Sequence, residues 1–429
     1  MKAKILRNTF INLAAIFALT QLLAAGTSDG RGFVGVSNTL PTNIIVVTNT
    51  NDSGPGSLRD ALAAASDGDT IDATGVSGTI LLTSGELQIN HNVTINGPGA
   101  ADLAVNGNAA SRVFENFASD ATIAGFTITN GSPTDAEGGG GILNHGGLIL
   151  SGTSILSNTT RSCGAFCIGA GGGINSNSGG ALTVTNSIIS DNSAGALSRG
   201  AGMYLVGGGI ATITDSTISG NTGALLGGGI SSSLHMLTVT NSTISDNSAG
   251  AGGGININSG GMLTVTNSTI SGNTANGLGG GIIIISGGML TVTNSTISGN
   301  STPARGGAVC NLGAATIGDT ILNASASGGT IVNAGTFTFT SLGYNLASDN
   351  GGGVLTGPGD QINTNPMLGP LQDNGGPTFT HALLPGSPAI DAGDPSFTPP
   401  PRYDQRGPGF QRVRHGRIDI GSFEVQRRH

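Results

Sequence analysis

The stretch GGGININSGGMLTVTNSTISGN at residues 252–273 returns almost unchanged as GGGIIIISGGMLTVTNSTISGN at residues 279–300. Related copies run from residue 139 to residue 325 and share one corner position, at steps of 29, 26, 26, 27 and 25 residues. That corner is filled by Asn186, Asp215, Asn241, Asn267, Asn294 and Asp319. Repeats built from helix pairs need about 33 residues or more, and Gly-rich, β-branched sequences disfavour helices. The repeat therefore predicts short strands.

Apolar and polar residues alternate within each copy. Leu263 and Val265 are expected to point inward, and Thr264 and Thr266 outward, which is the period of a β-strand. Three short strands and three corners account for one copy, and a chain that repeats this unit winds into a solenoid. Each strand then pairs in parallel with its equivalent about 4.8 Å away. Because parallel crossovers are nearly always right-handed, we predict an all-β fold, a right-handed, single-stranded parallel β-helix.

The glycines and asparagines of the repeat have positional roles. Glycine triplets such as 227–229 are expected where the backbone bends or takes a positive φ. A second corner carries asparagine, for which we expect left-handed backbone geometry and side-chain amides that hydrogen-bond along the axis. Its members are Asn192, Asn221, Asn247, Asn273 and Asn300. We interpret the Asn-Ser-Thr sequences as repeat corners rather than glycosylation sites.

Composition and charge restrict the class of protein. The chain has 76 glycines and 9 % charged residues, but its 37 % apolar residues are enough to bury a core. A net charge of -8 argues against a nucleic-acid partner. Residues 1–26 combine Lys2, Lys4 and Arg7 with an apolar run and small residues, the pattern of a signal peptide. No later segment is apolar enough to span a bilayer, so we expect a secreted or cell-surface protein.

The rest of the chain divides into four segments. These are a linker at 27–43, an N-terminal cap with the first irregular coils at 44–135, regular repeats of about 26 residues at 136–330 and an irregular C-terminal domain at 331–429. A solenoid must protect its open ends. Ser57 and Asp60 fit a capping box, and Leu58, Ala61 and Leu62 share one helical face. A short helix is therefore expected to cap the N-terminal end.

The C-terminal segment carries a family resemblance. SLGYNLASDNGGG through PGSPAIDAGDP at 341–395, with DQRG at 404–407 and DIGSFE at 419–424, resembles the choice-of-anchor Q domain of bacterial surface proteins. VTNTNDSGPGSLRDAL at 47–62 is similar to the segment that often opens such proteins. The central copies resemble repeats of polymorphic outer membrane proteins and of the pectin-lyase-like β-helix superfamily. The resemblance implies an extracellular β-helix, although neither a sorting motif nor a membrane-barrel pattern accompanies it here.

The pectin-lyase-like resemblance directs attention to polysaccharide cleavage, which needs two to four carboxylates close together. Asp191 and Asp246 share a turn position but lie two coils apart, with Gly220 between them. His145 and His235 are interpreted as isolated bystanders. We therefore predict an adhesin-like or display scaffold without catalytic, cofactor-binding or metal-binding residues. Binding of Ca²⁺ remains an alternative. The alternative function is that of a polysaccharide lyase or hydrolase. The expected partner is a polysaccharide or a cell-envelope component.

A further alternative is an ice- or glycan-binding module, because paired outward threonines recur on successive coils as a flat array. The array consists of Thr183, Thr185, Thr212, Thr214, Thr238, Thr240, Thr264, Thr266, Thr291 and Thr293.

Cys163 and Cys167 form a candidate disulfide in an exported chain, whereas Cys310 is expected to be a free thiol. The seven arginines near the C-terminus are expected on a solvated basic surface: Arg402, Arg406, Arg412, Arg414, Arg417, Arg427 and Arg428.

Overall fold

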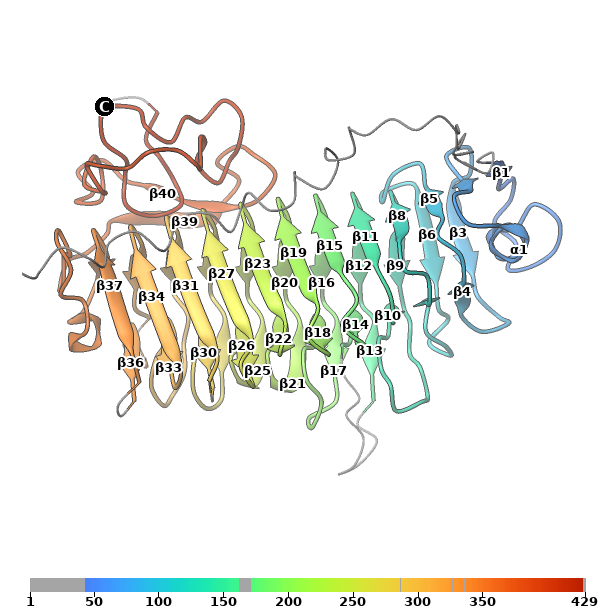
Figure 1. Cartoon of the computed structure of the whole chain (residues 1–429), viewed down its shortest axis with the longest axis horizontal. Helices are drawn as coiled ribbons and strands as arrows, with labels where there is room; N and C mark the ends of the chain where they lie inside the picture. Colours follow the sequence, from blue (N-terminus) through green and yellow to red (C-terminus); the bar gives the residue numbers. More distant parts are fainter. Residues whose placement is uncertain (1–42, 162–170, 286, 326, 335–336, 427–429) are drawn as a thin grey trace, which may run out of the picture. The chain divides into compact units, whose positions relative to one another are not determined.

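The computed structural model describes residues 43–426 except 162–170, 286, 326 and 335–336. In that part the backbone winds through three long sheets, here called A, B and C, of 12, 11 and 10 strands (Figure 1). Each strand pairs in parallel with the strand one coil on. The predicted signal peptide, nearly all of the linker, and Cys163 and Cys167 lie outside the described residues.

The strands of each sheet follow one another along the axis. Sheet A contains β1 (Ile44–Val46), β2 (Thr70–Asp72), β5 (Thr94–Asn96), β8 (Ala121–Ala124), β11 (Leu148–Ser151), β15 (Leu182–Thr185), β19 (Ile210–Thr214), β23 (Met236–Thr240), β27 (Met262–Thr266), β31 (Met289–Thr293), β34 (Ala314–Gly318) and β37 (Phe339–Gly343). Sheet B contains β3 (Gly78–Leu81), β6 (Leu103–Asn106), β9 (Thr127–Thr129), β12 (Ser154–Leu156), β16 (Ile188–Ser190), β20 (Thr217–Ser219), β24 (Thr243–Ser245), β28 (Thr269–Ser271), β32 (Thr296–Ser298), β35 (Ile321–Asn323) and β38 (Leu346–Ala347).

Sheet C contains β4 (Leu87–Ile89), β7 (Phe114–Asn116), β10 (Ile142–Asn144), β14 (Ile174–Ser176), β18 (Met203–Val206), β22 (Ile230–Ser233), β26 (Ile255–Asn258), β30 (Ile282–Ile284), β33 (Val309–Asn311) and β36 (Ile331–Asn333). A smaller sheet D contains β13 (Thr159–Thr160), β17 (Ser193–Ala194), β21 (Thr222–Leu226), β25 (Ser248–Ala251) and β29 (Thr274–Ala275). A 3₁₀ turn, η1 (Gly351–Gly353), and an antiparallel hairpin of β39 (Leu368–Gln372) and β40 (Thr380–Leu383) follow the coils.

Columns of like side chains fill the core. Leu237, Leu263 and Leu290 stand in register across sheet A and are at most 2 % exposed. The isoleucines at 244, 270 and 297 form the equivalent column in sheet B. Each fully buried side chain of this kind contributes about 1.5–3 kcal/mol. The alternation read from the repeat is thereby confirmed, because the inward residue of one coil meets the inward residue of the next.

The asparagines of the second corner form a buried ladder. Nδ2 of Asn221 donates to Oδ1 of Asn247, and Nδ2 of Asn247 donates to Oδ1 of Asn273, both at 2.9 Å. The predicted left-handed backbone at these asparagines is wrong, because the residue before each of them makes the bend: φ is 57° at Asp246 and 70° at Gly272. The asparagine side chain is then directed inward, where its amide satisfies buried backbone groups.

Helix α1 (Leu58–Ala64) begins after Ser57, whose side chain accepts a hydrogen bond from the backbone N–H of Asp60. Its buried face packs against β2 and β4, next to the first coils (Figure 1). The Asp60 carboxylate accepts from the backbone N–H of Gly54 rather than completing the capping box. Within the described residues, no helix has the length and hydropathy needed to cross a membrane.

The C-terminal segment after the coils packs on sheet B. Gln405 is fully buried between them: its Nε2 donates to Thr243 Oγ1 at 2.9 Å, and its Oε1 accepts from Thr269 Oγ1 at 2.6 Å. Arg406 pairs with Asp404 at 2.6 Å. The prediction of a solvated surface is therefore wrong for Arg406 and Arg412. Both side chains are buried, and acceptors within the segment bind both guanidinium groups.

Candidate functional site in the first coils

A groove of about 580 Å³ opens beside the first strands of sheet C, and we call it the N-terminal groove. Strand alternation turns Leu87 and Phe114 into the core and leaves Gln88 and Glu115 on the outer face. The charged residues that line the groove lie in helix α1, just before β4 and β7, or in the loop between β9 and β10. They are Arg59, Glu86, Arg112 and Asp135.

Arg112 is the centre of this arrangement, and its side chain is 2 % exposed. One terminal nitrogen donates to Glu86 Oε2 at 2.7 Å, the other donates to Asp135 Oδ2 at 2.9 Å, and Nε donates to the carbonyl oxygen of Gly138 at 3.1 Å. A buried charge of this kind requires such partners. The guanidinium of Arg112 thus holds the carboxylates of Glu86 and Asp135 at the rim of one groove, each bound to a different nitrogen.

The electrostatic balance of the site is negative. Arg59 pairs with Asp52 at 2.7 Å, so Arg112 is the guanidinium that faces Glu86, Asp135 and the neighbouring Glu115. Burial raises the pKa of Glu86; the positive charge of Arg112 opposes this shift, and Glu115 and Asp135 reinforce it. Carboxylates therefore outnumber cationic groups around the groove.

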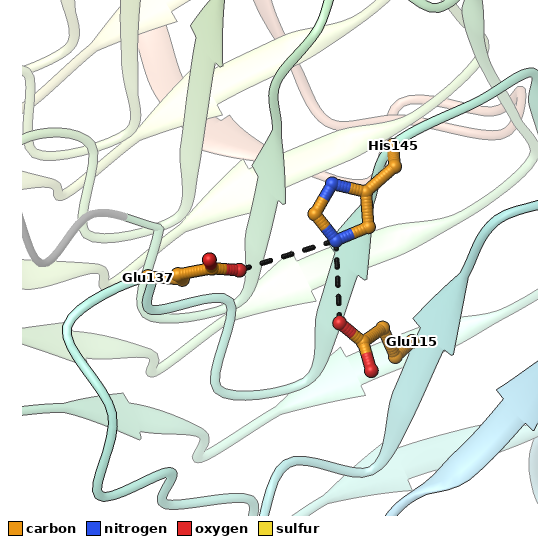
Figure 2. A group of neighbouring side chains, drawn as sticks. All are labelled: Glu115, Glu137 and His145. Carbon is orange, nitrogen blue, oxygen red and sulfur yellow. Dashed lines mark hydrogen bonds and ion pairs between the residues drawn. The ribbon is translucent and has the colours of Figure 1, made fainter.

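Beside the groove, Glu115, Glu137 and His145 come together (Figure 2). His145 Nε2 lies 3.2 Å from Glu115 Oε1 and 4.0 Å from Glu137 Oε2. The ligand-type atoms of the three residues all lie within 4.8 Å of one another. Among the described residues, no other group of three acidic, His or Cys side chains shows this spacing.

The interpretation of His145 as isolated is wrong, because Glu115, Glu137 and Phe117 surround it. His145 follows β10 one coil after Phe117, and the two rings stack with centroids 4.9 Å apart. The pairing of β7 with β10 brings both residues, and with them Glu115, to the same place on sheet C. The sequence signal for this contact is that Phe117 and His145 occupy equivalent positions in successive coils. The signal is weak because the first coils differ in length. His235, by contrast, is buried, and burial lowers its pKa.

A family model described as the right handed beta helix region matches residues 113–297 and 202–365. The chain belongs to the right-handed β-helix family. This membership confirms the predicted handedness and fold. The solved crystal structure of pectate lyase Pel9A is similar to this β-helix protein, with a TM-score of 0.58 and 15 % identity over 89 % of this chain and 96 % of that one. No curated protein matches the chain.

The threonines of the repeat lie on the outer face of sheet A, as the alternation of apolar and polar residues predicts. Thr238, Thr264 and Thr291 stand in register, as do the threonines at 240, 266 and 293. A parallel column of exposed apolar residues runs beside them. It consists of Ile210, Met236, Met262 and Met289, which are 39–56 % exposed. Sheet A therefore presents a regular lattice of hydroxyl, methyl and thioether groups.

The remaining candidates of the β-helix protein lie apart from the groove. Asp215 and Asp246 line a second cavity, of about 750 Å³, between sheet B and the C-terminal hairpin, together with Leu371 and Phe379. Cys310 is a free, buried thiol, as expected from the sequence. Burial raises its pKa to about 11, so it is a poor nucleophile at neutral pH.

Proposed function

We propose that this β-helix protein hydrolyses a polysaccharide in the N-terminal groove, with Glu86 and Asp135 as the working carboxylates. The supporting observation is that both line the groove and both are bound by the buried guanidinium of Arg112. Glycosidic hydrolysis uses two carboxyl groups, one that protonates the leaving oxygen and one that activates water or attacks the sugar. Arg112 would hold the pair at a fixed separation.

The charge of the groove favours a neutral polysaccharide. Both arginines that line the groove are paired with carboxylates, Arg59 with Asp52 and Arg112 with Glu86 and Asp135, so neither is free to bind a chain of uronic acids. Lysine occurs in this chain at positions 2 and 4 alone, and all three nitrogens of Arg112 are engaged. The nitrogens of Arg59, the other arginine of the groove, are likewise engaged. Among the described residues, no free basic side chain suited to β-elimination lines the groove, and hydrolysis is the better-supported reaction.

We expect Glu86→Gln and Asp135→Asn each to lower the rate of polysaccharide hydrolysis by about 100-fold or more, since each removes a carboxyl group that moves a proton or attacks the sugar. The measurement is release of reducing ends from a panel of neutral and acidic polysaccharides. Asp191→Asn, in an exposed corner outside the groove, is the matched control and should keep full activity.

The same assay contains the outcomes that would overturn the proposal. Unsaturated sugar ends from an acidic substrate would show a lyase instead. Retention of a polysaccharide without any product would support the adhesin-like scaffold. The signal-peptide pattern of residues 1–26 supports an extracellular place of action for either function.

A second candidate function, ice binding, is favoured by the lattice on sheet A. Neighbouring threonines are about 7 Å apart along a strand and about 4.8 Å apart between coils. The triple variant Thr240→Lys, Thr266→Lys and Thr293→Lys should abolish inhibition of ice recrystallisation, because long cationic side chains disrupt the flat array. If the unmutated protein shows no inhibition, this function is excluded.

A further inference from the structure

The geometry points to a divalent metal site of the Zn²⁺ type beside the N-terminal groove, with His145 Nε2 and the carboxylates of Glu115 and Glu137 as ligands. The three side chains come from β7, from the loop before β10 and from the residue after β10 (Figure 2). Glu86 and Asp135 are not among the ligands. The metal site therefore stands independently of the proposed hydrolysis.

The orientation of the imidazole supports the assignment. His145 Nδ1 lies 2.8 Å from Asn177 Oδ1, while Nε2 is directed at the two carboxylates. A hydrogen bond from the second ring nitrogen to an oxygen is the usual support of a metal-bound histidine. Stacking on Phe117, with the ring planes 12° apart, holds the imidazole in this orientation.

Three potential ligand groups face one another. Nε2 of His145 lies 3.2 Å from the carboxylate of Glu115 and 4.0 Å from that of Glu137. A divalent cation bound between the groups would neutralise the two carboxylates and use all three groups as ligands. The hydrogen bonds of Arg112 go to Glu86, Asp135 and Gly138, and Glu115, 4.0 Å away, is beyond hydrogen-bond distance of its guanidinium.

The ligand set favours Zn²⁺ over Ca²⁺ or Mg²⁺. The latter two ions prefer sites made entirely of oxygen, whereas an imidazole nitrogen with two carboxylates suits Zn²⁺ and related transition metals. Ligand distances of about 2.0–2.2 Å require the carboxylates to close on the imidazole. Glu137 can do so, since its side chain is 59 % exposed. Three protein ligands leave a fourth position for water, as in open zinc sites.

The test is calorimetric titration of the full-length protein with Zn²⁺ after chelator treatment, with elemental analysis of the stoichiometry. We expect one Zn²⁺ per chain and no binding of Ca²⁺ at the same concentrations. His145→Gln and Glu115→Gln should each weaken Zn²⁺ binding by more than about 100-fold, beyond the loss typical of removing a supporting residue. His91→Gln is the matched control, because His91 is exposed and its neighbour is Asp67, outside the site.

Several results would overturn the assignment. These are equal Zn²⁺ affinity in the His145 and Glu115 variants, tighter binding of Ca²⁺ than of Zn²⁺, and absence of Zn²⁺ binding. Circular dichroism of each variant establishes that the coils remain folded. Because no polysaccharide is present, a failure of the hydrolysis proposal leaves this result unaffected.

Discussion

Replacement of Asn247 by alanine is expected to lower the free energy of unfolding by about 3–5 kcal/mol. Oδ1 of Asn247 accepts from both the backbone and the side-chain N–H of Asn221, and its Nδ2 donates to Ile218 O and Asn273 Oδ1. All of these groups are buried, so the variant leaves donors and acceptors without partners and opens a cavity in the corner of the coil.

Urea denaturation and native-state hydrogen exchange measure this effect. A solenoid is stabilised by contacts between neighbouring coils, so exchange should accelerate first in β20, β24 and β28. Asn247→Asp keeps the size of the side chain but loses its donor, and we expect it to be destabilising as well. Asn276→Ala, at an exposed position, should change the stability by no more than about 0.5 kcal/mol. A similarly small change for Asn247→Ala would show that the ladder is not a stabilising element.

Replacement of Arg406 by methionine is expected to cost about 3–5 kcal/mol, because it leaves the carboxylate of Asp404 buried without its charged partner. Asp404 is fully buried and accepts hydrogen bonds from Arg406 through both carboxylate oxygens. The guanidinium also lies 3.9 Å from the centre of the Phe410 ring and 3.7 Å from that of Phe423, and these cation–π contacts are lost too.

Limited proteolysis and thermal unfolding distinguish a local effect from a global one. We expect cleavage within the segment after residue 366 while the coils stay resistant, since the segment contacts one sheet and the coils support one another. The double variant Asp404→Asn, Arg406→Met should recover part of the loss, because it removes the unpaired charge. Arg402→Met, at an exposed arginine, is the control. Equal protease resistance of Arg406→Met and the unmutated protein would contradict the argument.

The candidate site was much less predictable than the fold. Register partners in the first coils of sheet C lie 114 - 87 = 27 residues apart at Leu87 and Phe114, 142 - 114 = 28 apart at Phe114 and Ile142, and 174 - 142 = 32 apart at Ile142 and Ile174. In coils of such unequal length, the residues that meet cannot be derived by counting from a regular repeat. Carboxylates in register can therefore be derived from the sequence in the uniform copies alone, and the cluster of Glu115, Glu137 and His145 lies in the irregular first coils.

The sequence by itself determined the strands, the core and the asparagine ladder of this β-helix. Each depends on a local rule: alternation decides which side chain points inward, and a constant period stacks equal residues on one another. The tertiary structure alone decided that Arg112 binds Glu86 and Asp135, that His145 meets Glu115, and that Gln405 reaches Thr269 across 136 residues. These contacts depend on how unequal loops and a distant segment fold back onto the coils, and no local periodicity encodes that geometry.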